Sequence, residues 1–407
     1  MRLLRPVPAG AEVDESADTP ERVLRVGVNL LWLVPGVVGG SEEYTTRLLA
    51  ALAEQRPPDL DVTLFALAPF AEAHPELVDT FETVTINLDG RRKPERVAVE
   101  TTWLPVEASR RGIELLHHAG GVVPPGPAVS RIASALTIHD LQPLVLPENF
   151  STVKRRWLAA MLPRSARRAR LVFTPSEPAS DSVVELLGVE PERVLTVPHG
   201  VGAPAPVPAD QLDEVRVRYR LGDRVILYPA IPYPHKDHRT LVQAFAMLAR
   251  DRPDLTLVLA GGPGPSEAEL AATIRASGSG AQVRRTGRVS WSDLDALYAL
   301  ATVVAVPSRF EGFGAPALEA MAGGRPLVAA DATALPWVVG DGGVLVPPGD
   351  VAAWADALAA VVDDPARQAE LSAAGLVRSR HFTWARSGQA LAAGYRRAAA
   401  IGEDDGE

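Results

Sequence analysis

The densest group of residues that could do chemistry is the segment SRFEGFGAPALEAMAGGRP, residues 308–326. Glu311 and Glu319 are separated by seven residues, and Gly312 and Gly314 lie between them. Carboxylates accept hydrogen bonds, so a pair of them suits the hydroxyl groups of a sugar or a ribose. Gly314 lets the backbone approach a ligand closely, and the N-terminus of a following helix would favour a diphosphate. The segment therefore indicates a site for a phosphate-linked sugar.

We expect a short helix that begins near Pro316 and is stopped by Gly323 and Pro326. Glu319 is then in its first turn and Glu311 in the preceding loop. A buried strand, TVVAVP, ends just before this segment. Both carboxylates should therefore lie at the carboxyl edge of a parallel sheet, where open α/β folds bind ligands. From spacing alone, a solvated Glu311 and a Glu319 that only complements the helix dipole remain an alternative.

Histidines follow two other predicted strands. His139 and Asp140 follow the strand that ends in Thr137-Ile138, so we expect them to enter the same cleft. An imidazole there could hydrogen-bond a sugar hydroxyl or orient the reacting centre. The alternative is a histidine that only caps the end of a strand. His117 and His118 end another strand and are candidates for the acceptor side.

A lysine follows the first strand of the second half of the chain. Lys236 lies in YPAIPYPHKDH, residues 228–238, a loop stiffened by prolines. A cation at this place could neutralise a diphosphate as the sugar–phosphate bond breaks. The alternative is an ordinary surface lysine.

Gly39 and Gly40 follow the first strand and precede Ser41 and an amphipathic helix. We expect a tight turn with Ser41 as the N-cap, which could approach a phosphate or a sugar. The full glycine fingerprint of dinucleotide-binding proteins is absent, so an ordinary turn between strand and helix is the alternative.

Two patterns resemble sites of other kinds. Gly262-Pro-Gly264 lacks the third glycine of a dinucleotide fingerprint, and we interpret it as a loop that borders the nucleotide. Asp293-Leu-Asp295 resembles a metal-binding Asp-x-Asp motif. It falls at the start of a predicted helix with Ser292 as N-cap, so we assign it no metal.

The segment 154–170, KRRWLAAMLPRSARRAR, carries seven basic residues interleaved with apolar ones. The whole chain has a net charge of −9, so this local reversal could attract anionic lipid headgroups or an anionic acceptor. A solvated basic helix face is the alternative.

The elements that must position these groups alternate between short apolar runs and helical patterns, which is typical of parallel βαβ units. The alternation stops in the proline-rich segment 199–210 and then restarts, which predicts a linker between two similar domains. We predict a disordered tail at 1–21, domains at 22–205 and 206–385, and a C-terminal helix with an acidic tail at 386–407. The helical segment 352–400 could cap the second domain or return to the first. The predicted strands are Arg22–Leu31, Val62–Ala66, Val84–Leu88, Ile113–His117, Ser134–Ile138, Leu171–Thr174, Val194–Val197, Val225–Tyr228, Leu255–Leu259, Gln282–Thr286, Val303–Val306 and Pro326–Ala330.

The composition narrows the class of protein. A chain of 407 residues with 47% hydrophobic and 22% charged residues is globular and long enough for two cores. The net charge of −9 argues against a nucleic-acid partner, and the absence of cysteine removes disulfides, thiolate metal sites and cysteine nucleophiles. The chain shows neither a signal peptide nor an apolar run long enough to span a membrane, so we expect a cytoplasmic protein. If the basic segment 154–170 binds lipid, the protein would contact the inner face of the membrane.

Several segments together resemble the retaining glycosyltransferases of family 4, which have the twin Rossmann-like fold called GT-B. They run in family order from about residue 23 to 385, and the Glu-x7-Glu block with its Gly-Phe-Gly core is the most specific. The matching segments are VGGSEEY, TIHDLQPLVLPENF, FTPSE, VPHGV, PHKDH, TGRVSWSDLDALYALA and PSRFEGFGAPALEAMAGGRPLVAAD.

The resemblance implies roles for the matching residues. Glu311 would contact donor-sugar hydroxyls, and Glu319 would bind the ribose of the nucleotide. Lys236 would bind the diphosphate, and His139 would lie near the reacting sugar. Further donor-binding positions follow from the same match: Gly39, Gly40, Gly312, Phe313, Gly314, and Arg288 with Val289 beside the base.

Two positions depart from the family pattern. Ile231 stands where many members carry an arginine, and Trp337 replaces a common acidic residue. The first departure means that Lys236 works with another cation or that the phosphate site is built differently. The second has no consequence that the sequence alone predicts.

The resemblance implies transfer of a hexosyl group to a hydroxyl of a glycan, a lipid-linked acceptor or a small molecule. The segment TIHDLQPLVLPENF is most similar to members that use GDP-mannose, so we expect a mannosyl group. Neither a cofactor nor a divalent metal is expected. A nucleotide-sugar epimerase of the same fold and a non-catalytic subunit that binds nucleotide sugars are the alternatives.

Overall fold

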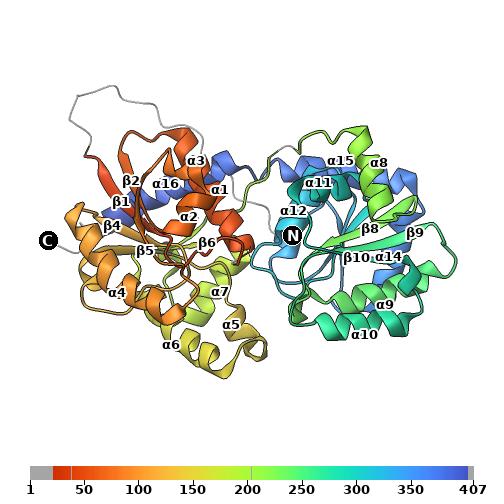
Figure 1. Ribbon diagram of the computed structural model, residues 1–407, viewed down its shortest axis with the longest axis horizontal. Helices are drawn as coiled ribbons and strands as arrows, with labels where there is room; N and C mark the ends of the chain where they lie inside the picture. Colours follow the sequence, from red (N-terminus) through yellow and green to blue (C-terminus); the bar gives the residue numbers. More distant parts are fainter. Residues whose placement is uncertain (1–21, 38, 203, 402–407) are drawn as a thin grey trace.

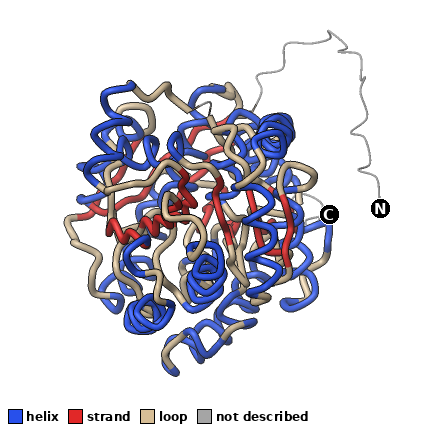
Figure 2. The backbone as a smooth tube through the Cα atoms, turned by 90° about the vertical axis from the view of Figure 1, so that its right-hand side faces the viewer, coloured by secondary structure: helices blue, strands red, loops and turns tan. Residues whose placement is uncertain are grey.

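The computed structural model describes residues 22–37, 39–202 and 204–401, and shows two parallel sheets side by side, each between layers of helices (Figure 1). Figure 2 shows the same layering from the side, with strands enclosed by helices. The predicted tail at 1–21 and the acidic end at 402–407 lie outside the described residues. The first sheet has the order β3-β2-β1-β4-β5-β6-β7. Its strands are β1 (Leu24–Asn29), β2 (Leu60–Leu67), β3 (Glu82–Ile86), β4 (Leu115–His118), β5 (Ala133–Thr137), β6 (Leu171–Thr174) and β7 (Val194–Thr196).

The second sheet has the order β10-β9-β8-β11-β12-β13 and is also parallel throughout. The predicted class, two Rossmann-like α/β domains, is confirmed. β13 was missed, because it is only three residues long and two of these residues are only partly buried. The strands are β8 (Arg224–Pro229), β9 (Leu255–Ala260), β10 (Val283–Gly287), β11 (Val303–Val306), β12 (Leu327–Ala330) and β13 (Val344–Val346).

Helices connect successive strands and cover both faces of each sheet (Figure 1). Five short 3-10 helices lie among the described residues: η1 (Val129–Arg131), η2 (Pro147–Asn149), η3 (Pro191–Arg193), η4 (Pro234–Lys236) and η5 (Gly280–Gln282). The α-helices of the first half are α1 (Gly40–Gln55), α2 (Ala68–Ala73), α3 (Pro75–Val78), α4 (Lys93–Arg110), α5 (Gln142–Val145), α6 (Thr152–Arg168) and α7 (Glu177–Leu187). Those that follow are α8 (Ala209–Arg218), α9 (His238–Ala249), α10 (Glu267–Ser277), α11 (Trp291–Leu300), α12 (Ala315–Ala322), α13 (Leu335–Val339), α14 (Val351–Val362), α15 (Pro365–Ser379) and α16 (Trp384–Ala400).

The central strands are apolar on both faces because helices cover both faces of the sheet. Every residue of β9, LTLVLA, is buried, and so is every residue of β11 and of β12. Burial of this kind needs no alternation of apolar and polar residues, which is why the sequence runs are continuous. The rigid sheets fix where each strand ends, and the site is built at those ends.

The C-terminal segment covers both domains. α14 and α15 pack on the second domain, whereas α16 returns and packs against α1 and the first sheet. Tyr395 of α16 is fully buried, and its hydroxyl lies 2.9 Å from Nδ1 of His117. Arg396 of the same helix forms two hydrogen bonds with Asp59. Both outcomes that the sequence left open for residues 352–400 therefore occur.

The chain crosses between the domains twice, and the two crossings lie side by side. The amide of Val201 donates to the carbonyl of Phe382 at 3.0 Å. A Cβ on Gly200 would lie 2.1 Å from the amide nitrogen of Trp384, so only glycine fits there. The domain limits at 205 and 385 stay predictions.

Two predicted helix caps are wrong. α1 begins at Gly40 with Gly39 as its N-cap, at a φ of 71°, and Ser41 lies inside the helix. α11 is capped by Ser290, whose side chain accepts a hydrogen bond from the amide of Asp293, and not by Ser292. In both cases the helix begins before the predicted serine, at Gly40 in α1 and at Trp291 in α11.

Candidate active site between the two domains

Two residues that the sequence singled out separately, Lys236 and Glu311, are in direct contact. Lys236, at the end of η4, places its Nζ 2.6 Å from Oε1 of Glu311, in the loop after β11. The two side chains are 19% and 11% exposed. The amide of Glu311 donates to Oγ1 of Thr333 at 2.9 Å, which fixes the backbone of the loop. A cation and a carboxylate are thus held together at the carboxyl edge of the second sheet.

The turn that follows Glu311 lies against the first domain. A Cβ on Gly312 would lie 2.2 Å from the carbonyl oxygen of His139 and 3.0 Å from Cβ of Asp140. Gly314 has a φ of 99°, a conformation that favours glycine, and it is the N-cap of α12. The two glycines therefore serve different needs: Gly312 allows close approach, and Gly314 allows the turn into the helix.

Glu319 is half-buried in α12 and lines a cavity to which both domains contribute. It is the fifth residue of the helix and so lies in the second turn, not the first as predicted, because the helix begins at Ala315. The hydroxyl of Tyr298 donates to Oε2 of Glu319 at 2.6 Å. The pKa of this carboxyl is raised from 4.5 to about 7, mainly because of burial and to a smaller extent because of the nearby carboxylate of Glu43, whereas the hydrogen bond from Tyr298 acts in the opposite direction.

A cavity of about 270 Å³ opens beside Glu319, and both domains contribute to it. Its walls combine the first turns of α1, the segment that connects the domains, and one face of α11. The lining residues include Gly40, Glu43, Arg47, His199, Gly200, Trp291, Asp295, Tyr298, Glu319 and Trp384.

His139 is mostly buried beneath the loop that follows β5. Its ring centroid lies 5.4 Å from that of Tyr44 and 6.0 Å from that of Trp32. Nε2 lies 3.1 Å from the carbonyl oxygen of Ala119, so this nitrogen carries the proton and donates it. Burial lowers the pKa of His139 to about 4, so the ring is neutral near pH 7. A neutral ring here can orient a ligand, with Nδ1 as the acceptor.

His117 and His118 do not line an open acceptor surface. His117 is 3% exposed and bonds Tyr395 and Thr137, so it holds α16 to the sheet. His118 is fully buried, with its Nδ1 3.3 Å from Nδ2 of Asn29. The interpretation of these two histidines as acceptor-side residues is wrong, since both rings point into the interior.

The glycine turn after β1 and the segment after β10 meet across the domains. Nη2 of Arg288 lies 3.4 Å from the carbonyl oxygen of Gly36, which precedes Gly39 and Gly40. Gly39 and Gly40 have open space where a Cβ would be. Val289 packs on the core of the second domain. Of the sequence-predicted site residues, Gly40 and Glu319 thus line the cavity between the domains, and Arg288 contacts the turn before Gly39.

The structure shows which residues contact Ile231 and Trp337, the two positions that depart from the family pattern. Ile231 lies in the loop that packs on Gly264, whose added Cβ would be 2.8 Å from Cγ2 of Ile231. Trp337 packs edge-on against Phe313, with ring centroids 6.3 Å apart, and against Phe382 at 5.4 Å. Trp337 therefore supports the Gly-Phe-Gly turn from behind.

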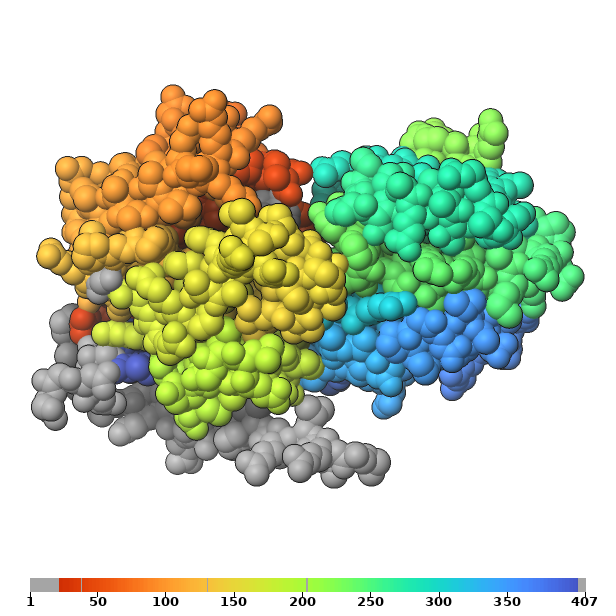
Figure 3. Space-filling view, turned by 90° about the horizontal axis from the view of Figure 1, so that it is seen from below, coloured from red at the N-terminus to blue at the C-terminus, as the bar shows by residue number. Residues whose placement is uncertain are grey.

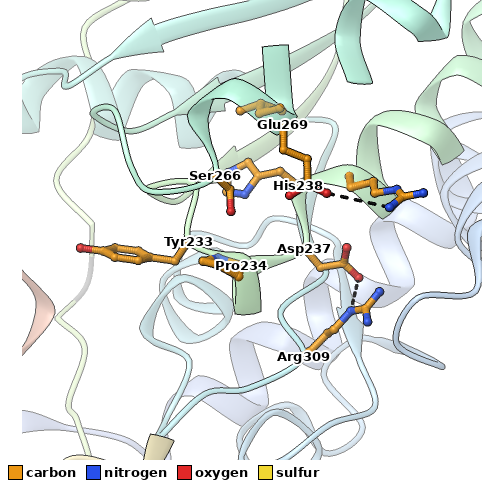
Figure 4. Close-up of a pocket in the computed structure, with 9 residues that line it drawn as sticks. Tyr233, Pro234, Asp237, His238, Ser266, Glu269 and Arg309 are labelled. Carbon is orange, nitrogen blue, oxygen red and sulfur yellow. Dashed lines mark hydrogen bonds and ion pairs between the residues drawn. The ribbon is translucent and has the colours of Figure 1, made fainter. Parts of the chain in front are cut away.

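A second cavity, of about 250 Å³, lies on another side of the loop that carries Lys236 (Figure 4). Asp237 pairs there with Arg309 at 2.7 Å. This pair and the caps of α9 stabilise the loop, since Asp237 also accepts hydrogen bonds from Thr240. Asp293, the first aspartate of the Asp-x-Asp pattern, accepts hydrogen bonds from Arg218 and Tyr219.

Sequence reasoning missed several residues that complete the site. Asp140 was expected in the cleft but given no role, and burial beside Glu311 raises its pKa. Ser176 and His199 belong to the segments FTPSE and VPHGV, which carried the resemblance without a role for either residue. Tyr298 likewise belongs to a matching segment, TGRVSWSDLDALYALA, but its hydrogen bond with Glu319 joins two helices and was not predictable from that segment.

The same arrangement of two domains is found in solved glycosyltransferase structures. The Anabaena protein HepE, solved in complex with UDP-glucose, superposes with a TM-score of 0.70 over 91% of this chain and 98% of that chain, at 22% identity. The glycosyltransferase WaaG, involved in lipopolysaccharide biosynthesis, superposes with a TM-score of 0.69 over 90% of this chain and 98% of that chain, at 14% identity. The fold is therefore GT-B.

Sequence comparisons define the family. Residues 38–203 match the model of glycosyltransferase family 4, and residues 213–377 match that of glycosyl transferases group 1. D-inositol 3-phosphate glycosyltransferase 1 of Catenulispora acidiphila is 34% identical over 291 residues, which is 69% of each chain. The chain belongs to the family 4 glycosyltransferases.

Another relative is O-antigen chain mannosyltransferase B of Escherichia coli. It is 32% identical over 253 residues, which is 61% of this chain and 66% of that protein. The D-inositol 3-phosphate glycosyltransferase of Kineococcus radiotolerans is 35% identical over 53% of this chain and 54% of that protein. The matched part thus spans about half to two thirds of the length of these two relatives.

Proposed function

We propose that the protein is a retaining glycosyltransferase that moves a hexosyl group from a nucleotide diphosphate sugar to a hydroxyl acceptor. Family membership and the contact between Lys236 and Glu311 support this proposal. We propose GDP-mannose as the donor, because the relatives include an O-antigen chain mannosyltransferase and a serotype-specific mannosyltransferase. The acceptor is a hydroxyl of a glycan, a lipid-linked sugar or a small molecule.

The proposed reaction replaces the phosphate on the same face of the sugar. The bond between the anomeric carbon and the phosphate oxygen breaks, and a bond from the acceptor oxygen to that carbon forms. The acceptor's proton passes to the departing phosphate oxygen, so the reaction needs no separate base. Closure of the two domains excludes water and aligns the acceptor.

Lys236 and the N-terminus of α12 are the proposed partners of the diphosphate. Lys236 would exchange Glu311 for a phosphate oxygen as the donor enters, and Glu311 would then accept hydrogen bonds from the sugar hydroxyls. Glu319 would accept from the ribose hydroxyls. Because a lysine and backbone amides supply the positive charge, we propose a reaction without a divalent metal.

The contact between Lys236 and Glu311 carries the proposal, and a thermal-shift screen tests it. GDP-mannose, UDP-glucose, ADP-glucose and dTDP-glucose are compared, since a bound donor stabilises the folded protein. Transfer is then measured with a panel of mannosides and inositol phosphates. Glu311→Ala should abolish transfer. Conversion of the nucleotide sugar to another nucleotide sugar without any acceptor would indicate an epimerase. A wild-type protein that binds the donor but transfers no sugar would indicate a non-catalytic binding subunit.

We also propose that α6 contacts an anionic membrane surface. Val153 is 81% exposed and Trp157 is 43% exposed, and Lys154, Arg155 and Arg156 beside them are exposed as well. This segment forms part of the surface in Figure 3, coloured yellow. Arg170 is engaged elsewhere, because it donates to carbonyls near the end of α16. No helix among the described residues is long and apolar enough to cross a membrane.

Sedimentation with phosphatidylglycerol vesicles tests the membrane proposal, with phosphatidylcholine vesicles as the control. The wild type should sediment with the anionic vesicles only. The double variant Arg155→Glu and Arg156→Glu should remain in solution, whereas Arg367→Glu, on the second domain, should not change binding. Equal sedimentation of the wild type and the double variant would end this part of the proposal.

A further inference from the structure

The carbonyl of Gly312, in the turn that we assign to the donor sugar, is held by a residue of the first domain. Oγ of Ser176 donates a hydrogen bond to this carbonyl oxygen at 2.7 Å, across 136 positions of sequence. Ser176 is fully buried. A hydrogen bond is directional, so this one constrains the plane of the Gly312–Phe313 peptide.

The same hydroxyl also begins a helix. Oγ of Ser176 accepts a hydrogen bond from the amide of Ala179 at 3.2 Å and is the N-cap of α7. A hydroxyl carries one hydrogen, which here is directed to Gly312, and the lone pair is directed to Ala179. The position of Ser176 is thus set by a rigid helix of the first domain.

Two other contacts hold the turn from the same side. The carbonyl of His139 lies against Gly312 with no room for a Cβ. The ring of Phe313 is stacked on that of His199, with centroids 4.5 Å apart and planes 12° apart. His199 in turn lies 4.5 Å from the ring of Tyr44 in α1. The turn is therefore shaped by both domains at once.

We propose that Ser176 is a positioning residue for the donor sugar. By holding the Gly312 carbonyl, it orients the following amides and the carboxylate of Glu311 toward the sugar, and it does so only when the domains are closed as they are here. The nucleotide is bound separately, by Glu319 and the cavity beside it, and is independent of Ser176. This inference rests on the proposed function.

The proposal predicts that substitution of Ser176 weakens catalysis and the binding of the donor's sugar but not the binding of its nucleotide. In Ser176→Ala, kcat should fall about tenfold, because a turn that is no longer held in place weakens the hydrogen bonds of its amides and of Glu311 to the transition state. The affinity for GDP should stay within about twofold of the wild type. The preference for GDP-mannose over GDP should shrink, and Ser176→Thr, which keeps a hydroxyl, should recover most of it.

Helix capping is separated from this role by two further variants. Ser176→Gly removes the hydroxyl but keeps a residue type that caps helices well, so it should lose the same kcat with little loss of melting temperature. Asp350→Ala removes the side-chain cap of α14, a helix that does not line the cavity beside Glu319, and should lower the melting temperature without changing the preference for GDP-mannose.

The experiment measures kcat, KM and the dissociation constants of GDP and GDP-mannose for the five proteins. If the wild type binds neither GDP-mannose nor another donor of the screen, the proposed function fails. If the wild type transfers sugar and Ser176→Gly keeps its kcat and its preference for the sugar nucleotide, the role of Ser176 fails. A parallel loss of GDP affinity would also overturn it, because that result indicates a general loosening of the domain.

Discussion

Lys236 and Glu311 bind each other, with Nζ 2.6 Å from Oε1, in the place that we assign to the donor's sugar and phosphate. Each therefore satisfies the other's charge while the site holds no donor. Both side chains are largely buried, so neither is well solvated on its own. A donor must supply a phosphate for the lysine and hydroxyls for the carboxylate, so it replaces both halves of the pair together.

Replacing the lysine should affect both stability and catalysis. In Lys236→Met, the departing phosphate loses its cation, and kcat should fall about 100-fold or more. Glu311 loses its partner, so the free energy of unfolding should fall by about 2 kcal/mol. Adding Glu311→Gln should restore stability but not activity. Lys93→Met, at an exposed position, is the control in the same assays, and a wild-type kcat in Lys236→Met would remove the lysine from the mechanism.

The titration of Glu319 should appear in the pH dependence of stability. Its pKa is raised from 4.5 to about 7, so the folded protein retains a proton that the unfolded chain releases. The resulting loss of stability is absent below about pH 4.5, grows as pH rises and is complete above about pH 7. Glu319→Gln removes it and should gain up to roughly 3 kcal/mol at pH 8 and little at pH 5. Melting temperatures at both pH values measure the difference, with the exposed Glu185→Gln as control.

Nucleotide affinity should depend on the same proton. An ionised Glu319 accepts hydrogen bonds from both ribose hydroxyls, whereas the protonated form has lost part of this capacity. Calorimetric titration with GDP should therefore show affinity that rises between pH 6 and pH 8 in the wild type. The affinity of Glu319→Gln should be weaker and flat over this range. An equal rise in both proteins would assign the pH dependence to another group.

A methyl group on Gly312 should keep the domains apart. In Gly312→Ala, the new Cβ would lie 2.2 Å from the carbonyl of His139, so the closed arrangement cannot form without a shift. Displacement of this size should lower kcat about 100-fold. Affinity for GDP should change little, because Glu319 is not moved. Small-angle scattering with GDP-mannose should show a larger radius than in the wild type, whereas Gly280→Ala, which meets only ordinary contacts, should match the wild type.

The sequence predicted the sheets because their strands are continuous apolar runs, and it predicted Glu311, Glu319, Lys236 and His139 because each follows a buried strand. The end of a strand is a local feature that the pattern of residues contains. The contact between Lys236 and Glu311 joins two such ends and is implied once both strands are neighbours in one sheet, as β8 and β11 are.

Other relationships were not predictable because they depend on packing between distant elements. Ser176 reads as an ordinary helix cap, and only the closed domains show that its hydrogen points at Gly312. The caps of α1 and α11 were misplaced because a serine near a helix start does not show which residue adopts the capping conformation. His117 was misassigned because α16, which covers it, lies almost 280 positions away along the chain.

The return of α16 to the first domain should depend on Tyr395. His117 is neutral, since burial lowers its pKa to about 3, and its two ring nitrogens bond Tyr395 and Thr137. Tyr395→Phe leaves Nδ1 buried without this partner, so the free energy of unfolding should fall by about 1–3 kcal/mol. Urea unfolding followed by tryptophan fluorescence measures the change. Tyr233→Phe is the matched control, because Tyr233 is 43% exposed, and it should leave the free energy of unfolding unchanged. In Tyr395→Phe, kcat should stay at the wild-type value, because His117 faces the interior. An unchanged unfolding midpoint in this variant would mean that apolar packing alone holds α16 in place.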